Sequence, residues 1–120
     1  MFLIPILVKN KSAYIYKYRW KGGFFQINLF IFVGLNGNDM ISRCYLEITN
    51  VCNLDCLFCP KTDRAKRLMS PEEFDALTDK LKDEVRFLYF HLMGEPFLHP
   101  QLAQFVRSAR HKGFVPVITT

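Results

Sequence analysis

The sequence predicts an α/β fold, a partial (β/α) barrel with parallel strands that comprises about the first two and a half βα units. From residue 41 onward, strand-like apolar segments alternate with amphipathic helical segments, and each strand-to-strand connection is long enough to be a crossover. Crossovers of this kind make neighbouring strands parallel. The chain has 120 residues, whereas a complete barrel of eight such units needs ~250. We therefore expect an incomplete barrel.

Residues 44–49 form the first predicted strand, because they are rich in β-forming types. A helix is predicted to follow Ser70, since Pro71 suits the first helical position and Glu73 completes a capping box. Its apolar stripe has the spacing i, i+3 and i+7 and consists of Phe74, Leu77 and Leu81.

Residues 85–93 are almost continuously apolar, which is typical of a strand covered on both faces. A second helix is predicted from His99-Pro100 to a glycine at position 113, where glycine favours a helix end. The third predicted strand is 115–119. His99 is expected to be a surface or capping residue.

Alternation along the first two strands places polar and aromatic side chains on one face. Glu47 shares a face with Tyr45, and Tyr89 shares one with His91. If both faces of the sheet are covered, this face is the barrel interior and these side chains line a cavity. A polar core residue with satisfied hydrogen bonds fits the same pattern, so both interpretations stay open.

The chain divides into an N-terminal extension, residues 1–39, and an incomplete core domain, residues 40–120. The extension is dense in aromatic residues and lysine and could pair as a hairpin around Gly22-Gly23, or be poorly ordered. A sharper alternative is that Met40 is the true start of the protein. We expect no chemistry in the extension.

Charge and hydropathy exclude several classes of protein. The net charge is +5, but residues 1–39 hold five basic residues against one acidic, while residues 40–120 hold eleven against ten. We therefore expect no nucleic-acid partner. The longest apolar stretch, residues 24–35, is shorter than the ~20 residues of a spanning helix, and the first eight residues lack the features of a signal peptide. The expected location is the reducing cytoplasm, with no membrane partner.

Three cysteines, Cys52, Cys56 and Cys59, have the spacing C-x3-C-x2-C and follow the first strand at its carboxyl end. Thiolates suit iron–sulfur clusters or zinc, and three of them can hold three corners of a cubane while one iron stays open. A structural zinc site with Cys44 as fourth ligand is an alternative. A redox pair from Cys56 and Cys59 would leave Cys52 without a role. Cys44 is expected to be a small buried apolar residue.

Residues 45–60, with the sequence YLEITNVCNLDCLFCP, resemble the cluster-binding signature of the radical S-adenosylmethionine (SAM) superfamily. In that family the residue before the last cysteine is usually aromatic, as Phe58 is here. Residues 91–100, HLMGEPFLHP, are similar to the family's Gly-Gly-Glu-Pro stretch, with Met93 in place of the first glycine. The resemblance covers residues 41–120.

The resemblance implies a [4Fe–4S] cluster on the three cysteines, with SAM bound to the open iron. Reductive cleavage of SAM would yield a 5′-deoxyadenosyl radical that abstracts hydrogen from an unknown substrate, which is oxidoreductase-type chemistry. Phe58 would lie near the adenine, and Gly94, Glu95 and Pro96 near the methionyl end. For Glu95, a turn residue or a helix-capping carboxylate is the alternative. No catalytic residue is expected within this chain beyond these cofactor-binding ones.

The resemblance also implies an electron donor of flavodoxin or ferredoxin type. The basic run 61–67 is interpreted as a solvated connector, with a docking surface for that donor as the alternative. Since the family's later strands are missing, we expect the 120 residues to cleave SAM poorly alone. The competing hypotheses are a non-catalytic zinc or iron–sulfur binding module and an inactive gene remnant.

Overall fold

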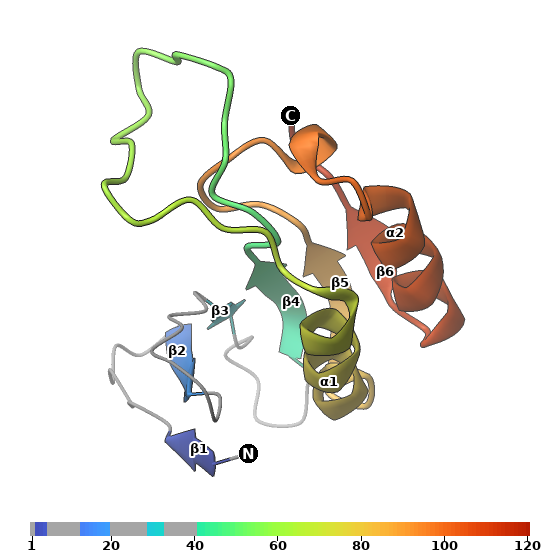
Figure 1. Ribbon diagram of the computed structural model, residues 1–120. Helices are drawn as coiled ribbons and strands as arrows, with labels where there is room; N and C mark the ends of the chain where they lie inside the picture. The colour runs from blue at the N-terminus through green and yellow to red at the C-terminus, as the bar shows by residue number, and fades with distance from the viewer. Residues whose placement is uncertain (1, 5–12, 20–28, 33–40) are drawn as a thin grey trace.

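The computed structural model describes residues 2–4, 13–19, 29–32 and 41–120. Its central feature is a three-stranded parallel arrangement of β4 (Ile41–Leu46), β5 (Val85–Tyr89) and β6 (Val115–Val117). The connections are the helices α1 (Pro71–Leu81) and α2 (Leu102–His111), which cover one face of the sheet (Figure 1). The predicted β–α–β–α–β order and the parallel pairing are confirmed.

Three further strands continue the sheet beyond β4. They are β1 (Phe2–Ile4), β2 (Ala13–Arg19) and β3 (Leu29–Phe32), and the strand order is β1-β2-β3-β4-β5-β6. β2 pairs with β3, and β3 with β4, in antiparallel fashion. The antiparallel pairing of β2 and β3 agrees with the expected hairpin, while the Gly22-Gly23 turn lies outside the described residues. That residues 1–39 form a separate extension, and that Met40 is the start, remain predictions.

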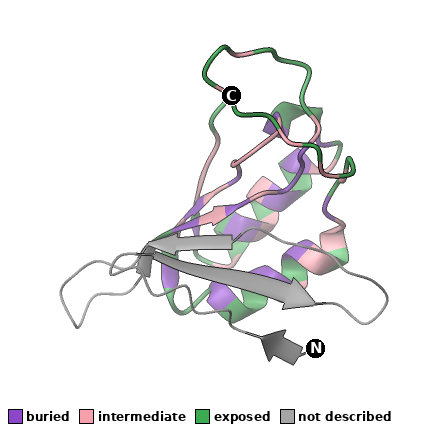
Figure 2. Cartoon of the chain, turned by 90° about the vertical axis from the view of Figure 1, so that its left-hand side faces the viewer, coloured by how far each residue is buried: buried purple, intermediate pink, exposed green. Residues whose placement is uncertain are grey.

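The core of the described residues lies between the parallel strands and the two helices. Alternate residues of β4 and β5 point toward the helices and are buried, among them Leu46 and Leu88. From the helices, Phe74 stacks on Phe105 with ring centroids 4.3 Å apart. Figure 2 shows buried residues along one side of each helix. Burying each such side chain stabilises the fold by ~1.5–3 kcal/mol, so this layer fixes the strand ends that carry the site.

Helix α1 begins where the sequence predicts. The Ser70 hydroxyl accepts a hydrogen bond from the Glu73 N–H at 3.2 Å, and the Glu73 carboxylate accepts one from the Ser70 N–H at 2.8 Å. The predicted capping box is therefore present, and Pro71 occupies the first helical position.

Helix α2 begins at Leu102, three residues later than predicted, and a separate 3-10 turn, η1 (Pro96–Leu98), precedes it. His99 is not a surface residue: it is buried, and it joins α2 to the start of α1. Its Nδ1 accepts a hydrogen bond from the Gln101 N–H at 3.1 Å, and its Nε2 lies 3.0 Å from the Met69 carbonyl oxygen. The burial of His99 contradicts the predicted surface position. His99 is the C-cap of η1 through its backbone N–H, whereas the N-cap of α2 is Gln101.

All three parallel strands end earlier than predicted, at Leu46, Tyr89 and Val117. After β5 the Phe90 N–H still donates to the Val117 carbonyl of β6 at 3.0 Å, whereas after β4 the backbone bonds to the returning chain. The Ile48 carbonyl, for example, accepts a hydrogen bond from the Met69 N–H at 2.8 Å. Among the described helices, none is long and apolar enough to cross a membrane.

Candidate functional site

The candidate site lies at the carboxyl ends of β4 and β5, where the chain between β4 and α1 makes a wide excursion away from the sheet (Figure 1). We divide this excursion into an outgoing limb, residues 48–51, the cysteine loop, residues 52–63, and a returning limb, residues 64–69. A second segment, the GEP loop of residues 93–96, follows β5. Carboxyl ends of parallel strands are where α/β folds place their sites.

Polar side chains join the two limbs at the base of the cysteine loop. The Asn50 side chain donates to the Ala65 carbonyl at 2.9 Å and accepts from the Arg67 N–H at 2.7 Å. The Thr49 hydroxyl donates to the Arg67 carbonyl at 3.0 Å. Thr49 and Asn50 are both buried, and a buried polar group with satisfied partners holds its neighbours in one arrangement. The base of the loop is therefore fixed, by two residues whose roles the sequence alone does not indicate.

The three predicted ligands, Cys52, Cys56 and Cys59, all lie on the cysteine loop as free thiols; Cys52 is exposed and the other two are half-buried. The Cys59 N–H donates to the Cys56 carbonyl at 3.1 Å, and the Leu54 N–H lies 3.4 Å from the Cys52 sulfur. Within residues 41–120, no three Cys, His, Asp or Glu side chains gather closely enough to hold a metal ion. The structure thus places the thiols on one loop without bringing them together, and ligation remains a prediction.

The donor set nevertheless fits a three-cysteine cluster. Cys44 is fully buried on the helix-facing side of β4, and burial raises the pKa of its thiol to about 12. A protonated thiol inside the core is a poor metal ligand. The cysteines available to a metal are therefore the three on the loop, as an iron–sulfur cluster with one open iron requires.

Apolar side chains on the cysteine loop are unusually exposed. Leu57 and Phe58 have 104% and 90% of their surface open to solvent. A cluster of exposed apolar side chains is typical of a surface that a ligand or partner covers. Phe58 lies on the loop as predicted, and its contact with an adenine ring stays a prediction.

The GEP loop packs directly on the outgoing limb. Gly94 has φ +89°, and a Cβ atom at this position would lie 2.5 Å from the Thr49 carbonyl oxygen. The Glu95 N–H donates to the Val51 carbonyl at 2.8 Å. Only glycine combines this conformation with so close an approach. Met93, which replaces the family's first glycine, does not have a positive φ, so the backbone accommodates a side chain there.

Glu95 is a buried carboxylate held at two points. One oxygen accepts from the Phe97 N–H at 3.0 Å, and the other from the Thr120 hydroxyl at 2.7 Å. Pro96 is buried and begins η1. Because a carboxylate has about four acceptor positions, Glu95 retains capacity for another donor such as an ammonium group.

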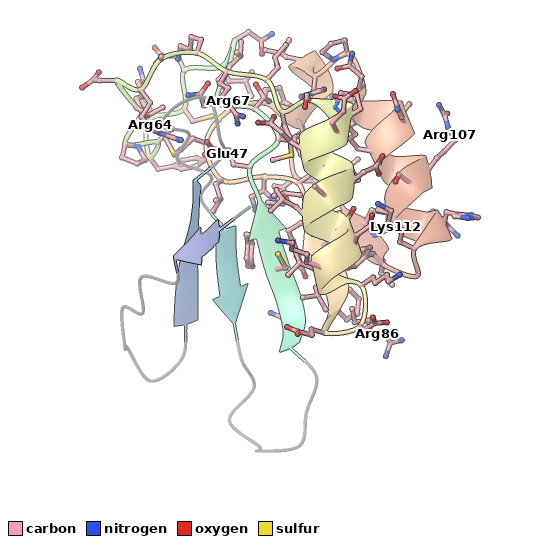
Figure 3. The ribbon with its side chains drawn as sticks, turned by 60° about the horizontal axis from the view of Figure 1, so that its bottom comes forward. Glu47, Arg64, Arg67, Arg86, Arg107 and Lys112 are labelled. Carbon is pink, nitrogen blue, oxygen red and sulfur yellow. The ribbon has the colours of Figure 1, made fainter. Side chains whose placement is uncertain are left out.

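Glu47 contacts the returning limb and the GEP loop. Its side chain is 7% exposed, and its two oxygens receive the Arg64 guanidinium at 2.7 and 2.9 Å. One of them also accepts the Met93 N–H at 3.2 Å. Donating these hydrogen bonds to the Glu47 carboxylate raises the pKa of Arg64 above its usual value. Figure 3 shows Glu47, Arg64 and Arg67 at the same end of the molecule.

The basic run 61–67 is therefore only partly a solvated connector. Arg64 pairs with Glu47, and Arg67 pairs with Glu73. Glu47 lies 17 residues before Arg64, so no short-range spacing in the sequence indicates their pairing.

Aromatic side chains line the face of the sheet opposite the helices. Tyr45 stacks on Tyr89 with ring centroids 4.7 Å apart, and His91 meets the two rings edge-on at 5.4 and 5.9 Å. The His91 Nδ1 atom is buried without a hydrogen-bond partner, and burial lowers the pKa of this imidazole. The alternation predicted from the sequence therefore brings these three side chains together.

Comparison with known proteins gives the chain its family. The family model described as Radical SAM superfamily matches residues 46–120, which include the cysteine loop and the GEP loop. The chain is 35% identical over 80 residues to the tungsten-containing aldehyde ferredoxin oxidoreductase cofactor-modifying protein of Pyrococcus furiosus. That match covers 63% of this chain and 22% of the relative, so the chain spans about a fifth of the length of that protein. Members of this superfamily use an iron–sulfur cluster and SAM for radical chemistry. By the match over most of its length and by its parallel strands with α1 and α2 as crossovers, the chain belongs to the radical SAM superfamily.

Proposed function

We propose that this chain is the cluster-binding and SAM-binding part of a radical SAM enzyme. Cys52, Cys56 and Cys59 would ligate a [4Fe–4S] cluster and leave one iron for SAM. The observation that carries this proposal is the direct packing of the GEP loop on the outgoing limb, through Gly94 and the hydrogen bond from the Glu95 N–H to the Val51 carbonyl. This contact keeps a carboxylate beside the limb that leads into the cysteines.

The residues of the GEP loop would receive the methionyl end of SAM. Glu95 is buried and held at two points, so its remaining acceptor positions are fixed in direction and suit the ammonium group. Gly94 and Pro96 set the backbone path that presents it. On the cysteine loop, the exposed ring of Phe58 would cover the adenine. When bound, cluster and SAM together would supply one-electron cleavage of a sulfonium bond and hydrogen abstraction from a substrate.

The aromatic face of the sheet would exclude water from that chemistry. Tyr45, Tyr89 and His91 form a packed, weakly polar surface on the side away from the helices. A reactive radical needs a dry enclosure, which such a surface helps to provide. These residues would line the cavity and not react.

Partners and location follow from the same chemistry. We propose an electron donor of flavodoxin or ferredoxin type and a reducing, cytoplasmic location, because three ligating thiols must stay reduced. The nearly balanced charge of residues 40–120 supports the absence of a nucleic-acid partner.

Anaerobic reconstitution with iron and sulfide tests the proposal. We expect about four irons per chain, the count of a [4Fe–4S] cluster, and a change in the electron paramagnetic resonance spectrum of the reduced cluster when SAM is added. Cys52→Ser, Cys56→Ser and Cys59→Ser should each lose most of the iron, whereas Cys44→Ala should retain it. Stoichiometric zinc in place of iron, or full iron content in any serine variant, would instead support a non-catalytic metal-binding module.

A further inference from the structure

The Glu47 side chain links the returning limb to the GEP loop. It immediately follows β4, so its backbone is anchored in the sheet. Its carboxylate forms a two-pronged ion pair with Arg64 and accepts the Met93 N–H. A bidentate pair between arginine and a carboxylate fixes the orientation of the two side chains as well as their distance.

The two groups that Glu47 holds are each close in sequence to a predicted cofactor contact. Arg64 lies five residues after Cys59, and its Nε donates to the Thr62 hydroxyl at 3.0 Å, which orients the guanidinium. Met93 lies two residues before Glu95. A short path of bonds and hydrogen bonds therefore joins the end of the cysteine loop to the carboxylate of the GEP loop through one buried acid.

Of the other ion pairs in the described chain, Lys61–Asp55 lies within the cysteine loop, and two further groups make different connections. Arg67 pairs with Glu73 and so holds the returning limb against α1. Lys112 pairs with Asp75 and Asp79 between the two helices, on the opposite side of the molecule from Glu47 (Figure 3). The Glu47 pair thus differs from both in what it connects.

We propose that Glu47 is a positioning residue that sets the separation of the cysteine loop and the GEP loop, and thereby the placement of SAM between them. This inference rests on the proposed function. Removing one member of a mostly buried ion pair leaves the other charge uncompensated and frees the segments that the pair held. Glu47→Gln should therefore loosen the GEP loop while the three cysteines, which are neighbours on one loop, still bind iron.

Amide hydrogen exchange of the cluster-free chain tests the positioning directly. In Glu47→Gln, the amides of Met93, Gly94 and Glu95 should exchange at least about tenfold faster, as expected when a local hydrogen-bonded unit opens more often. Asp75→Asn, which removes an ion-pair partner on the helix side, is the matched control and should leave these amides unchanged. If Glu47→Gln fails to fold, Arg64→Lys offers a milder loss of the two-pronged pair. Unchanged exchange in the folded variants would overturn the proposal.

The reconstituted protein supplies the second measurement. We expect Glu47→Gln to keep the iron content of the wild type and to weaken SAM binding by about tenfold or more, measured by titrating the spectrum of the reduced cluster, because a small misplacement of a positioned ligand is costly. A merely structural role would instead lower thermal stability and iron content together. A wild-type chain that takes up no iron would refute the proposed function, whereas the exchange experiment judges Glu47 independently.

Discussion

Gly94 is the residue at which the GEP loop packs on the backbone of the outgoing limb. Its φ is positive, and a Cβ atom placed on it would lie 2.5 Å from the Thr49 carbonyl oxygen, which leaves no room for a side chain. The close contact therefore requires a residue without a Cβ atom. Replacing this glycine by alanine tests that requirement.

We expect Gly94→Ala to destabilise the chain by about 2 kcal/mol or more, because an L-residue is strained at this φ and its Cβ collides with backbone. Gly113 provides a matched control, since it has φ +92° but nothing lies within 4 Å of its Cβ position. Gly113→Ala should lose only the stability that the strained φ costs, without a collision of the Cβ atom, and so less than Gly94→Ala. Urea unfolding followed by circular dichroism compares the two, and equal losses would show that the close approach to Thr49 is unimportant.

His99 makes stability depend on pH. Its Nδ1 accepts the Gln101 N–H, so the neutral form must carry its proton on Nε2, facing the Met69 carbonyl. Burial lowers the pKa of His99 in the folded state, and the hydrogen bond to Met69 offsets this in part. The unfolded chain therefore binds a proton more readily than the folded chain once the pH falls below ~6.5.

Stability should consequently be highest above that pH and decline as the pH falls from ~6.5 toward the lowered folded pKa. The urea midpoint of wild type should drop between about pH 7.5 and pH 5.5. His99→Gln should show a smaller drop, with the remainder from His91, whose pKa burial also lowers. If the urea midpoint of His99→Gln falls with pH as steeply as that of wild type, the pH dependence comes from other groups.

At the residue scale, the sequence predicts which residue types the candidate site contains better than it predicts the hydrogen bonds that hold them in place. The cysteines, Gly94 and Glu95 stand in recognisable order, because the proposed ligation and the backbone geometry at Gly94 would restrict the residue types. The role of Asn50 and the partner of Glu47 are not apparent from the sequence. Both depend on hydrogen bonds to groups 15 to 46 residues away, which local spacing does not encode.

Helix α1 is the element whose beginning the sequence predicts best, because its capping residues act locally. Ser70 and Glu73 exchange hydrogen bonds across three residues, and Phe74 follows as the first buried position. The helix start also fixes the end of the returning limb, so this cap supports the base of the cysteine loop.

We expect Ser70→Ala to cost about 1 kcal/mol of stability, the usual value of an N-cap side chain. Ser108→Ala is a matched change on α2, where the hydroxyl donates to an exposed Asp75 carboxylate, and it should stay within ~0.5 kcal/mol of wild type. Urea unfolding of both variants makes the comparison. Equal values would mean that tertiary packing, not the cap, fixes the start of α1.

The strands show the opposite behaviour. The apolar run 85–93 predicts a strand to Met93, yet β5 ends at Tyr89. Beyond that point Phe90 is buried in the core, and the chain turns so that the Met93 N–H donates to Glu47. Hydropathy reports burial, and burial continues past the last residue of the strand.

On the scale of the whole molecule, the described core is confined to the C-terminal two-thirds of the chain. The buried apolar cluster runs from Cys44 to Phe114, with Ile118 packed against it, and the family match covers 46–120. The strands of residues 1–39 meet this unit by pairing of β3 with β4. The antiparallel half of the sheet could be anticipated only as a hairpin, since nothing in its sequence specifies that it pairs with β4.

This arrangement predicts the behaviour of a variant that begins at Met40. It should keep the helical circular dichroism signal of α1 and α2 and bind iron on reconstitution, because every predicted ligand and the described core lie within it. It should also self-associate more than the full chain, since removing β3 exposes the backbone hydrogen-bonding edge of β4, and open edges recruit other strands. Analytical ultracentrifugation at several concentrations measures this. Loss of the helical signal in the shortened chain would show that the antiparallel strands are part of the folding unit. If the shortened chain folds and its association is unchanged, β4 does not need β3 to protect its edge.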